Sequence, residues 1–268
     1  MAYSPLLIKA AAGRTIVDVT PERAGWTYTG FRAIRLAAGE AEPLDTGHRE
    51  LCVVVLRGQI DLRIEGRMYS ALGTRDSVFE DQAPAAVYVP AGRHLELRAT
   101  RDAEIALCSA PSDTRERLVR VLDPAAMKRS TRGKGSNQRH ICDILPHTDP
   151  TAAHLLVVEV VTPAGHSSSY PPHKHDQHIE GQETQLEETY YHRLDPAQGF
   201  AFQRVYTDDR SLDEAIVIEN HDTVMVPRGY HPVVAPHGYD LYYLNVMAGP
   251  QRNWVFKNDP RHEWLLKA

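Results

Sequence analysis

An internal echo between the two halves of the chain is the feature that most limits its fold. The first half holds Glu50 at the start of an apolar run and then the turn Pro90-Ala-Gly-Arg-His94. The second half holds Glu188 at the start of another such run and then Pro227-Arg-Gly-Tyr-His231. The glutamate-to-histidine separation is 44 residues in the first half and 43 in the second. Two elements in register predict a duplicated domain.

Short apolar runs between turn residues fill both halves. They include Leu51–Leu56, Gln59–Ile64, Ala86–Val89, His94–Arg98, Ile105–Ser109, Leu155–Val161, Glu188–His192, Ala201–Tyr206, Ala215–Ile218, Thr223–Val226 and Asp240–Val246. Gly, Pro, Asn and Asp separate these runs, which is typical of strands joined by turns and predicts an all-β sandwich or barrel. We expect one helix over Pro111–Leu122 and a second in the C-terminal tail.

The upstream segments Leu36-Ala-Ala-Gly39 and Thr162-Pro-Ala-Gly165 add a third pair in register. A chain of 268 residues is long enough for two β domains. The boundary should fall near residues 111–140, so we expect domains over 1–125 and 126–268. The basic, Gly/Ser-rich segment Lys128–Arg139 is interpreted as a solvated linker rather than a phosphate-binding strip.

Charge and hydropathy exclude several classes of function. The net charge of −5 does not suit nucleic-acid binding, and no run approaches the roughly 20 apolar residues that span a bilayer. The N-terminus lacks the long apolar region of a signal peptide, so a cytoplasmic location is expected. Cys52, Cys108 and Cys142 are odd in number and widely spaced, and they predict neither a disulfide framework nor a Cys-x-x-Cys zinc site.

Two histidines one residue apart, His173 and His175, are the clearest sign of metal chemistry. In a strand, the two-residue side-chain period places both imidazoles on one face and turns Lys174 the other way. Glu188 and His231 follow on later predicted strands. Imidazoles with a carboxylate suit Zn, Fe, Ni or Mn, and these four ligands leave one or two positions for water or substrate. We therefore predict a catalytic metal site in the second half.

Neighbouring residues offer alternatives within this site. Glu187 is the other available carboxylate, but Glu188 occupies the position that matches Glu50. His192 shares the strand face of Glu188 and either lines the pocket, packs in the core or forms a hydrogen bond. His178 lies in the loop His178–Gln185 and is interpreted as solvated.

The first half has no His-x-His pair. It keeps Glu50 and His94, with His48 nearby, and so few ligands would bind a metal weakly. The first half is therefore interpreted as a degenerate copy with a structural role.

Longer runs in the second half resemble a known family. They are Ser168–Asp176, Leu186–Tyr191, Gln198–Thr207, Val226–Val234, Gly238–Pro250 and Trp254–His262. The pattern of His-x-His, Glu and Pro-x-Gly-x-His resembles the cupin superfamily, and these runs resemble the 5-deoxy-glucuronate isomerases of myo-inositol catabolism. The first half matches more loosely, at Glu50–Gly58 and Tyr88–Gly92. The resemblance implies a bicupin with two tandem cupin domains of double-stranded β-helix, or jelly-roll, type, the first degenerate and the second catalytic. His166 and Ser167 depart from the family's usual Asn-Trp near the pocket mouth.

The resemblance implies a metal-dependent sugar-acid isomerase that converts 5-deoxy-D-glucuronate into 2-deoxy-5-keto-D-gluconate. A proton leaves the carbon beside a carbonyl, an enediol forms, and a proton returns at the neighbouring carbon. A divalent metal, Zn first with Mn or Fe as alternatives, would stabilise negative charge on the enediol oxygens. Glu187, a hydroxide on the metal and a pocket tyrosine such as Tyr190 remain alternatives for the proton transfer.

A substrate with a carboxylate and hydroxyls needs a cation and hydrogen-bonding groups. Arg228 precedes His231 by three residues and would receive the carboxylate, with Arg204 as the second choice; a structural clamp on the turn is the alternative role of Arg228. The substrate hydroxyls are expected to meet Gln203, Tyr190 and Tyr243, although strand packing would equally explain the tyrosines.

Three other functions fit parts of the pattern. A related cupin isomerase that acts on a 4-deoxy-5-keto-uronate spaces the His-x-His and Glu ligands closely, whereas twelve residues separate His175 from Glu188 here. A cupin dioxygenase would use Fe or Mn and consume oxygen. A non-catalytic sugar-acid-binding cupin would normally carry an output module. We expect a small sugar acid as the partner, neither nucleic acid nor membrane, and by analogy a homo-oligomer.

Overall fold

Strands make up nearly all the regular structure in the computed structural model, which describes residues 3–112, 114 and 116–267. Helical elements among these residues are α1 (Pro21–Ala24) and three 3-10 turns, namely η1 (Pro124–Ala126), η2 (Gly135–Asn137) and η3 (Glu263–Lys267). The prediction of an all-β chain is confirmed. No helix among the described residues is long and apolar enough to cross a membrane.

The first half (residues 15–122) forms one eight-stranded antiparallel sheet. Its strands are β2 (Thr15–Val19), β3 (Gly30–Leu36), β4 (Ala41–Asp45), β5 (Arg49–Ile64), β6 (Arg67–Leu72), β7 (Ala85–Val89), β8 (His94–Pro111) and β9 (Arg120–Leu122). The long strands β5 and β8 pair along their lengths with register shifts around Gly58, which bend the sheet. Gly58 has φ +80°, and a Cβ there would lie 2.0 Å from the carbonyl oxygen of Asp102, so the bend requires glycine.

The second half (β1 with residues 128–267) has a seven-stranded and a four-stranded sheet face to face. The larger sheet has the order β1 (Leu7–Ile8), β18 (Thr223–Val226), β15 (Glu187–Asp195), β20 (Asp240–Ala248), β12 (Leu156–Thr162), β11 (Arg139–Leu145) and β10 (Lys128–Arg132). The smaller sheet has the order β13 (Ser167–Ser168), β19 (Val233–Val234), β16 (Phe200–Tyr206) and β17 (Asp213–Glu219). A pair, β14 (His173–Lys174) with β21 (Lys257–Asn258), closes one end.

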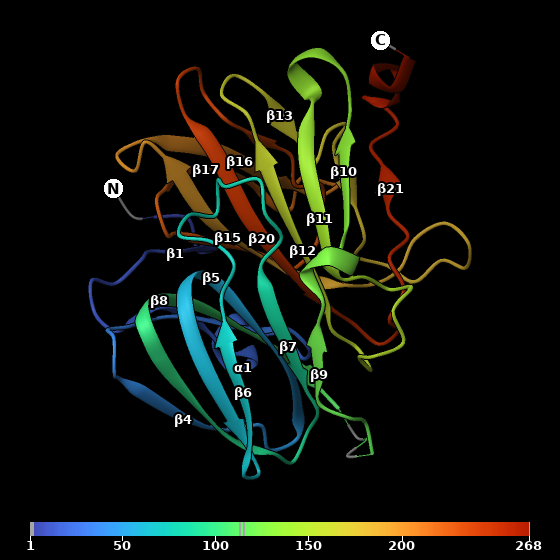
Figure 1. Cartoon of the computed structure of the whole chain (residues 1–268). Coiled ribbons are helices and arrows are strands. Elements are labelled where there is room, and N and C mark those ends of the chain that lie inside the picture. The colour runs from blue at the N-terminus through green and yellow to red at the C-terminus, as the bar shows by residue number, and fades with distance from the viewer. Residues whose placement is uncertain (1–2, 113, 115, 268) are drawn as a thin grey trace.

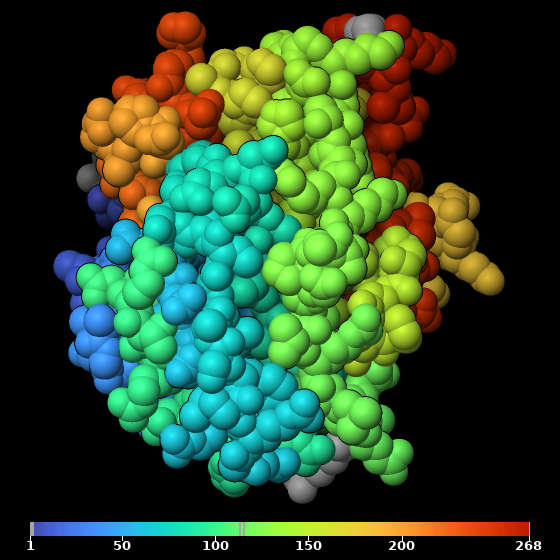
Figure 2. Space-filling view, viewed as in Figure 1, coloured from blue at the N-terminus to red at the C-terminus, as the bar shows by residue number. Residues whose placement is uncertain are grey.

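Three apolar clusters hold these sheets together. One lies within the first half and one between the two sheets of the second half. The third joins the halves, because Val54 and Tyr88 of the first half pack with Tyr242 and Val246 of the second. In Figure 1 the N-terminal strand β1 lies among the strands of the second half, where Leu7 pairs with Val224, and Figure 2 shows the two halves abutting over this face.

The two predicted helices are wrong for the described residues. Within Pro111–Leu122, Pro111 ends β8 and Arg120–Leu122 is strand β9, which pairs with β7 through Leu122 and Ala86; residues 113 and 115 lie outside the described residues. The leucine and valine spacing suits a helix, but Leu122 is buried through pairing with the edge of the sheet. The C-terminal tail forms only the 3-10 turn η3.

Candidate metal centre and substrate cavity

The predicted metal ligands come from three segments of the second half. His173 starts the short strand β14 and His175 follows it, whereas Glu188 is the second residue of β15. His231 lies just beyond Gly229, in the turn between β18 and β19. Gly229 has φ +91°, and a Cβ there would lie 2.5 Å from the carbonyl oxygen of Tyr206, so this turn needs glycine to aim His231 inward.

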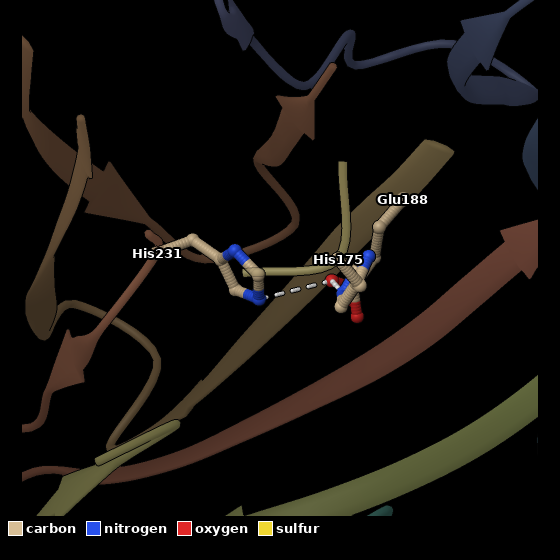
Figure 3. A group of neighbouring side chains, drawn as sticks. All are labelled: His175, Glu188 and His231. Atoms are coloured by element: carbon tan, nitrogen blue, oxygen red, sulfur yellow. Dashed lines mark hydrogen bonds and ion pairs between the residues drawn. The ribbon is translucent and has the colours of Figure 1, made fainter. Parts of the chain in front are cut away.

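Three of the four predicted ligands meet in a buried cluster. The Nε2 atom of His175 lies 3.1 Å from Oε2 of Glu188, and the Nε2 atom of His231 lies 3.3 Å from the same oxygen. One ligand atom from each of these residues falls within 4.8 Å of the others. Figure 3 shows the three side chains pointing toward one another from separate segments.

Hydrogen bonds on the far side of the rings orient this cluster. His231 donates from Nδ1 to the carbonyl oxygen of Gly229 at 2.8 Å, and Nδ1 of His175 lies 3.3 Å from the carbonyl oxygen of Leu186. The Nε2 lone pair of His231 therefore faces the Glu188 carboxylate, and that buried nitrogen has no hydrogen-bond partner. A lone pair facing a carboxylate is unfavourable unless a cation lies between them. The donor set thus fits a divalent metal with imidazole and carboxylate ligands.

Burial sets the charge state of the imidazoles. Burial, with smaller contributions from His173 and His175, lowers the pKa of His231 to about 3. The pKa of His175 is raised despite its burial, because Glu188 accepts its hydrogen bond and attracts its positive charge. His231 is thus a neutral imidazole near neutral pH, the form that binds metals.

His173 lies beside the cluster rather than in it. Its ring centroid is 4.9 Å from that of His231 and 6.3 Å from that of His175, and its ring contacts Phe256. It also lines the adjoining cavity. Lys174 points the other way, as strand alternation requires, and its ammonium lies 2.8 Å from Asp176.

Glu187 lies on the opposite face of β15 from Glu188. Its carboxylate accepts the backbone N–H groups of Thr27, Tyr28 and Thr29 at 2.7, 2.7 and 2.9 Å, all in the first half. The structure therefore does not bring Glu187 to the cluster, and this position does not support the predicted role of Glu187 in proton transfer.

A cavity of about 1010 Å³ adjoins the cluster. Its polar lining includes Ser169, Tyr190, Tyr243 and Asn245, with Ser169 Oγ 3.0 Å from Tyr190 Oη. Hydrophobic walls come from Ile141, Val158, Val160, Trp254 and Phe256. The loop around η2 and the C-terminal turn η3 both line it, and they lie side by side in Figure 1. Hydroxyls, an amide and aromatic surfaces are the groups that bind a sugar.

The predicted substrate residues divide between the interior and the surface. Gln203 is buried, its Nε2 donates to the carbonyl oxygen of His231 at 3.4 Å, and its Oε1 has no partner. Arg204 points outward from the same strand and forms a bidentate ion pair with Asp213, in which Nε and Nη2 each donate to a carboxylate oxygen at 2.7 Å. Arg228 is exposed, and neither arginine lines the cavity. The two arginines are therefore wrong choices for a carboxylate contact inside it.

The predicted linker contributes to the cavity instead. Lys128–Arg132 is strand β10, and Arg132, Lys134 and Arg139 line the cavity. We missed Arg139 and Asn245 in the sequence. The alternating run Arg139–Leu145 offered a signal, since it is typical of a strand that puts Arg139 on the same face as Ile141.

His192 is fully buried, and both of its ring nitrogens lack a hydrogen-bond partner. Its ring stacks on Tyr190 with centroids 5.9 Å apart, and burial lowers its pKa to about 3. His192 does not line the cavity, so it packs in the core of the second half as a neutral side chain. His178 is exposed.

In the first half, His94 is exposed and pairs with Asp45, so it does not point into the sheet as a metal ligand would. Glu50 is buried and accepts N–H groups of Ala153, His154 and Leu155, each at 2.7 Å, and the hydroxyl of Tyr88. Glu50 of the first half therefore accepts hydrogen bonds from the backbone of the second half, and Glu187 of the second half accepts them from the backbone of the first.

The sheets, together with a buried cluster of two histidines and a glutamate, define a cupin-like all-β protein. Solved structures agree: oxalate decarboxylase from Lactobacillus farciminis superimposes with a TM-score of 0.65 at 14% identity, covering 100% of this chain and 92% of that one. An IolB-like protein from Salmonella typhimurium LT2 superimposes with a TM-score of 0.95 at 47% identity, covering 97% and 99%.

The chain belongs to the KduI/IolB family, whose model matches residues 6–265. It is 49% identical over 253 residues to a 5-deoxy-glucuronate isomerase of Geobacillus thermodenitrificans, covering 94% of this chain and 92% of the relative. It is 47% identical over 256 residues to a 5-deoxy-glucuronate isomerase of Bacillus subtilis strain 168, covering 95% and 93%. The family resemblance read from the sequence is confirmed.

Proposed function

We propose that this protein is a metal-dependent isomerase that converts 5-deoxy-D-glucuronate into 2-deoxy-5-keto-D-gluconate. The observation that carries the proposal is the near full-length identity of 47–49% to relatives that bear this name. The buried histidine–glutamate cluster beside a cavity of about 1010 Å³, lined by hydroxyl and amide groups, supports it.

His175, Glu188 and His231 would hold the metal, with His173 as the fourth ligand at the cavity side. A divalent cation there supplies Lewis acidity to the oxygens that gain charge when the enediol forms. Zn is our first choice because the isomerisation needs no redox change, and Mn or Fe are the alternatives. The unpartnered Nε2 of His231 supports a cation at this point.

Tyr190 is the proposed proton-transfer residue. Its hydroxyl lines the cavity beside Ser169, and burial followed by the charge of Glu188 raises its pKa well above the usual value. A phenol with a raised pKa stays protonated near neutral pH, so Tyr190 Oη can donate to an enediol oxygen. Tyr243 and Asn245, which line the cavity, are proposed to hold the substrate hydroxyls, and Gln203, which does not line it, is proposed to support the His231 turn through its hydrogen bond to the His231 carbonyl oxygen.

We also propose that the chain is a bicupin with domains over 1–125 and 126–268. The shared pairing pattern supports this, because β5 pairs with β7 and β8 as β15 pairs with β18 and β20. Strand β1 is the exception, since it crosses to the second half. Three buried free cysteines suit the proposed cytoplasmic location, where thiols stay reduced. A homo-oligomer is proposed by analogy with other cupins alone.

The test is an isomerase assay on 5-deoxy-D-glucuronate with purified protein of known metal content. We expect turnover that is lost on chelation and returns with Zn, Mn or Fe, without oxygen uptake. His231→Ala should lose both the metal and the activity, whereas His178→Ala, an exposed histidine, should lose neither. Oxygen uptake would favour a dioxygenase, and turnover of a 4-deoxy-5-keto-uronate alone would favour the related isomerase.

A further inference from the structure

Arg139 carries a positive charge that no carboxylate among the described residues neutralises. Its Nη1 donates to the backbone carbonyl and the side-chain oxygen of Asn137, at 3.0 and 3.3 Å, while Nε and Nη2 make no hydrogen bond. Among the other inward cations of the described residues, Arg75 pairs with Glu159 and Arg193 with Glu104, while Arg252 donates from all three of its nitrogens to backbone carbonyl oxygens. A partly buried guanidinium with free N–H groups is a ready partner for an anion.

The Arg139 side chain is part of the cavity described above. Arg139 lines it together with His173, Tyr190, Tyr243 and Asn245. One cavity is therefore lined both by Arg139 and by residues beside the histidine–glutamate cluster.

The sheet fixes the interval between the two ends of this cavity. Glu188 lies on β15 and Arg139 on β11, with β20 and β12 between them. The registers place His140 level with Arg193, so Arg139 lies about six residues, or roughly 20 Å, from Glu188 along the strands as well as about 14 Å across three interstrand spacings. The long Arg139 side chain and the His173 ring both line the cavity between these two points. The intervening strands supply Tyr243, Asn245, Val158 and Val160 as the floor.

We propose that Arg139 is the anchor for the carboxylate of a sugar-acid substrate, with the exposed Arg132 and Lys134 adding positive potential at the cavity rim. This rests on the proposed function for the identity of the substrate. In 5-deoxy-D-glucuronate the carboxylate and the aldehyde stand at opposite ends of the carbon chain. A carboxylate held at Arg139 therefore directs the aldehyde end toward the histidine–glutamate cluster, and it makes neutral aldoses poor substrates.

Two matched probes measure the charge preference directly. D-Glucuronate and D-glucuronamide have the same sugar, but only the first has a carboxylate. Titration calorimetry on metal-loaded protein should show that D-glucuronate binds about 10- to 100-fold more tightly, as expected for hydrogen bonds to a charged group. Arg139→Gln should remove this preference, and Arg139→Lys should retain part of it.

Arg129→Gln is the matched control. Arg129 lies on the same β10–β11 hairpin, does not line this cavity and pairs with Asp81 of the first half. We expect it to keep the preference. Metal content and thermal unfolding of each variant separate a lost anchor from a lost fold, because Arg139→Gln should bind a full complement of metal.

Each outcome bears on one proposal at a time. The proposed anchor is overturned if the native chain binds the two probes equally. It is also overturned if Arg139→Gln keeps the preference for D-glucuronate, because the carboxylate would then bind elsewhere, such as on the metal. An anchor that behaves as expected in a protein without isomerase turnover would overturn the proposed function and leave the anion site standing. With turnover present, Arg139→Gln should raise KM for 5-deoxy-D-glucuronate about 10- to 100-fold and change kcat less.

Discussion

Glu187 and Glu188 are consecutive residues whose carboxylates point to opposite faces of β15. Glu188 lies 3.1 Å from His175 in the buried cluster, whereas Glu187 accepts three backbone N–H groups from residues 27–29 of the first half. A single dipeptide thus holds the candidate metal centre on one side and the contact between the halves on the other. The position of Glu188, the proposed metal ligand, is therefore coupled to the docking of the first half.

Mutation of Glu188 should affect metal binding, whereas mutation of Glu187 should affect the stability of the fold. Glu188→Gln removes the charge from the cluster and should lower metal stoichiometry and activity. Glu187→Gln keeps the shape but weakens three charge-assisted hydrogen bonds, and it should lower the free energy of unfolding by about 1–3 kcal/mol while the metal remains bound. Metal analysis and urea unfolding of both variants check the pattern. Metal loss in Glu187→Gln at full folding would contradict it.

Glu50 should behave as a structural residue without metal. Its buried carboxylate accepts three backbone N–H groups of residues 153–155 and the Tyr88 hydroxyl. Glu50→Ala leaves these donors without a partner and should destabilise the fold by about 3 kcal/mol or more. His94→Ala, at the exposed position that echoes His231, should change stability by less than about 0.5 kcal/mol. Zn bound per chain should stay the same in His94→Ala, and a drop would indicate a second site.

The histidine–glutamate cluster could be predicted from the sequence because its ligands lie at fixed positions relative to strand starts and a Pro-Gly turn. The choice between adjacent residues needed strand alternation. The sequence predicts both Gln203 and Arg204 as substrate contacts. Neighbouring side chains in a strand face opposite ways, so only Gln203 points inward. The alternating run Arg139–Leu145 indicates a strand with Arg139 and Ile141 on one face, but the place of that face in the cavity also depends on the pairing of β11 with β12, which is a long-range contact.

His192 should make the fold sensitive to acid. Burial lowers its pKa to about 3 in the folded chain, whereas in the unfolded chain it titrates near 6.5. Between these values the unfolded chain binds the extra proton, so stability is lost as the pH falls from about 6.5 toward 3, by up to about 1.4 kcal/mol per pH unit. His192→Phe, which keeps a ring beside Tyr190, should flatten this part of the pH–stability curve. His178→Phe, at an exposed position, should leave the slope unchanged, and an equal slope in both variants would exclude His192 as its source.

Tyr190 and Tyr191 provide the sharpest test of the proposed proton transfer, because they too are neighbours on opposite faces of β15. Tyr190 reaches the cavity, whereas Tyr191 donates to Glu104 of the first half at 2.7 Å. Tyr190→Phe keeps the ring against His192 and Tyr243 but removes the proton, so kcat should fall about 100-fold with little change in KM or metal content. Tyr191→Phe should instead lower the free energy of unfolding by about 1–3 kcal/mol, because the buried Glu104 carboxylate loses a donor, and it should leave kcat near the native value. A native kcat in Tyr190→Phe would show that the proton travels by another group, and an equal loss of kcat in both variants would mean that packing along β15, rather than the Tyr190 hydroxyl, limits the reaction.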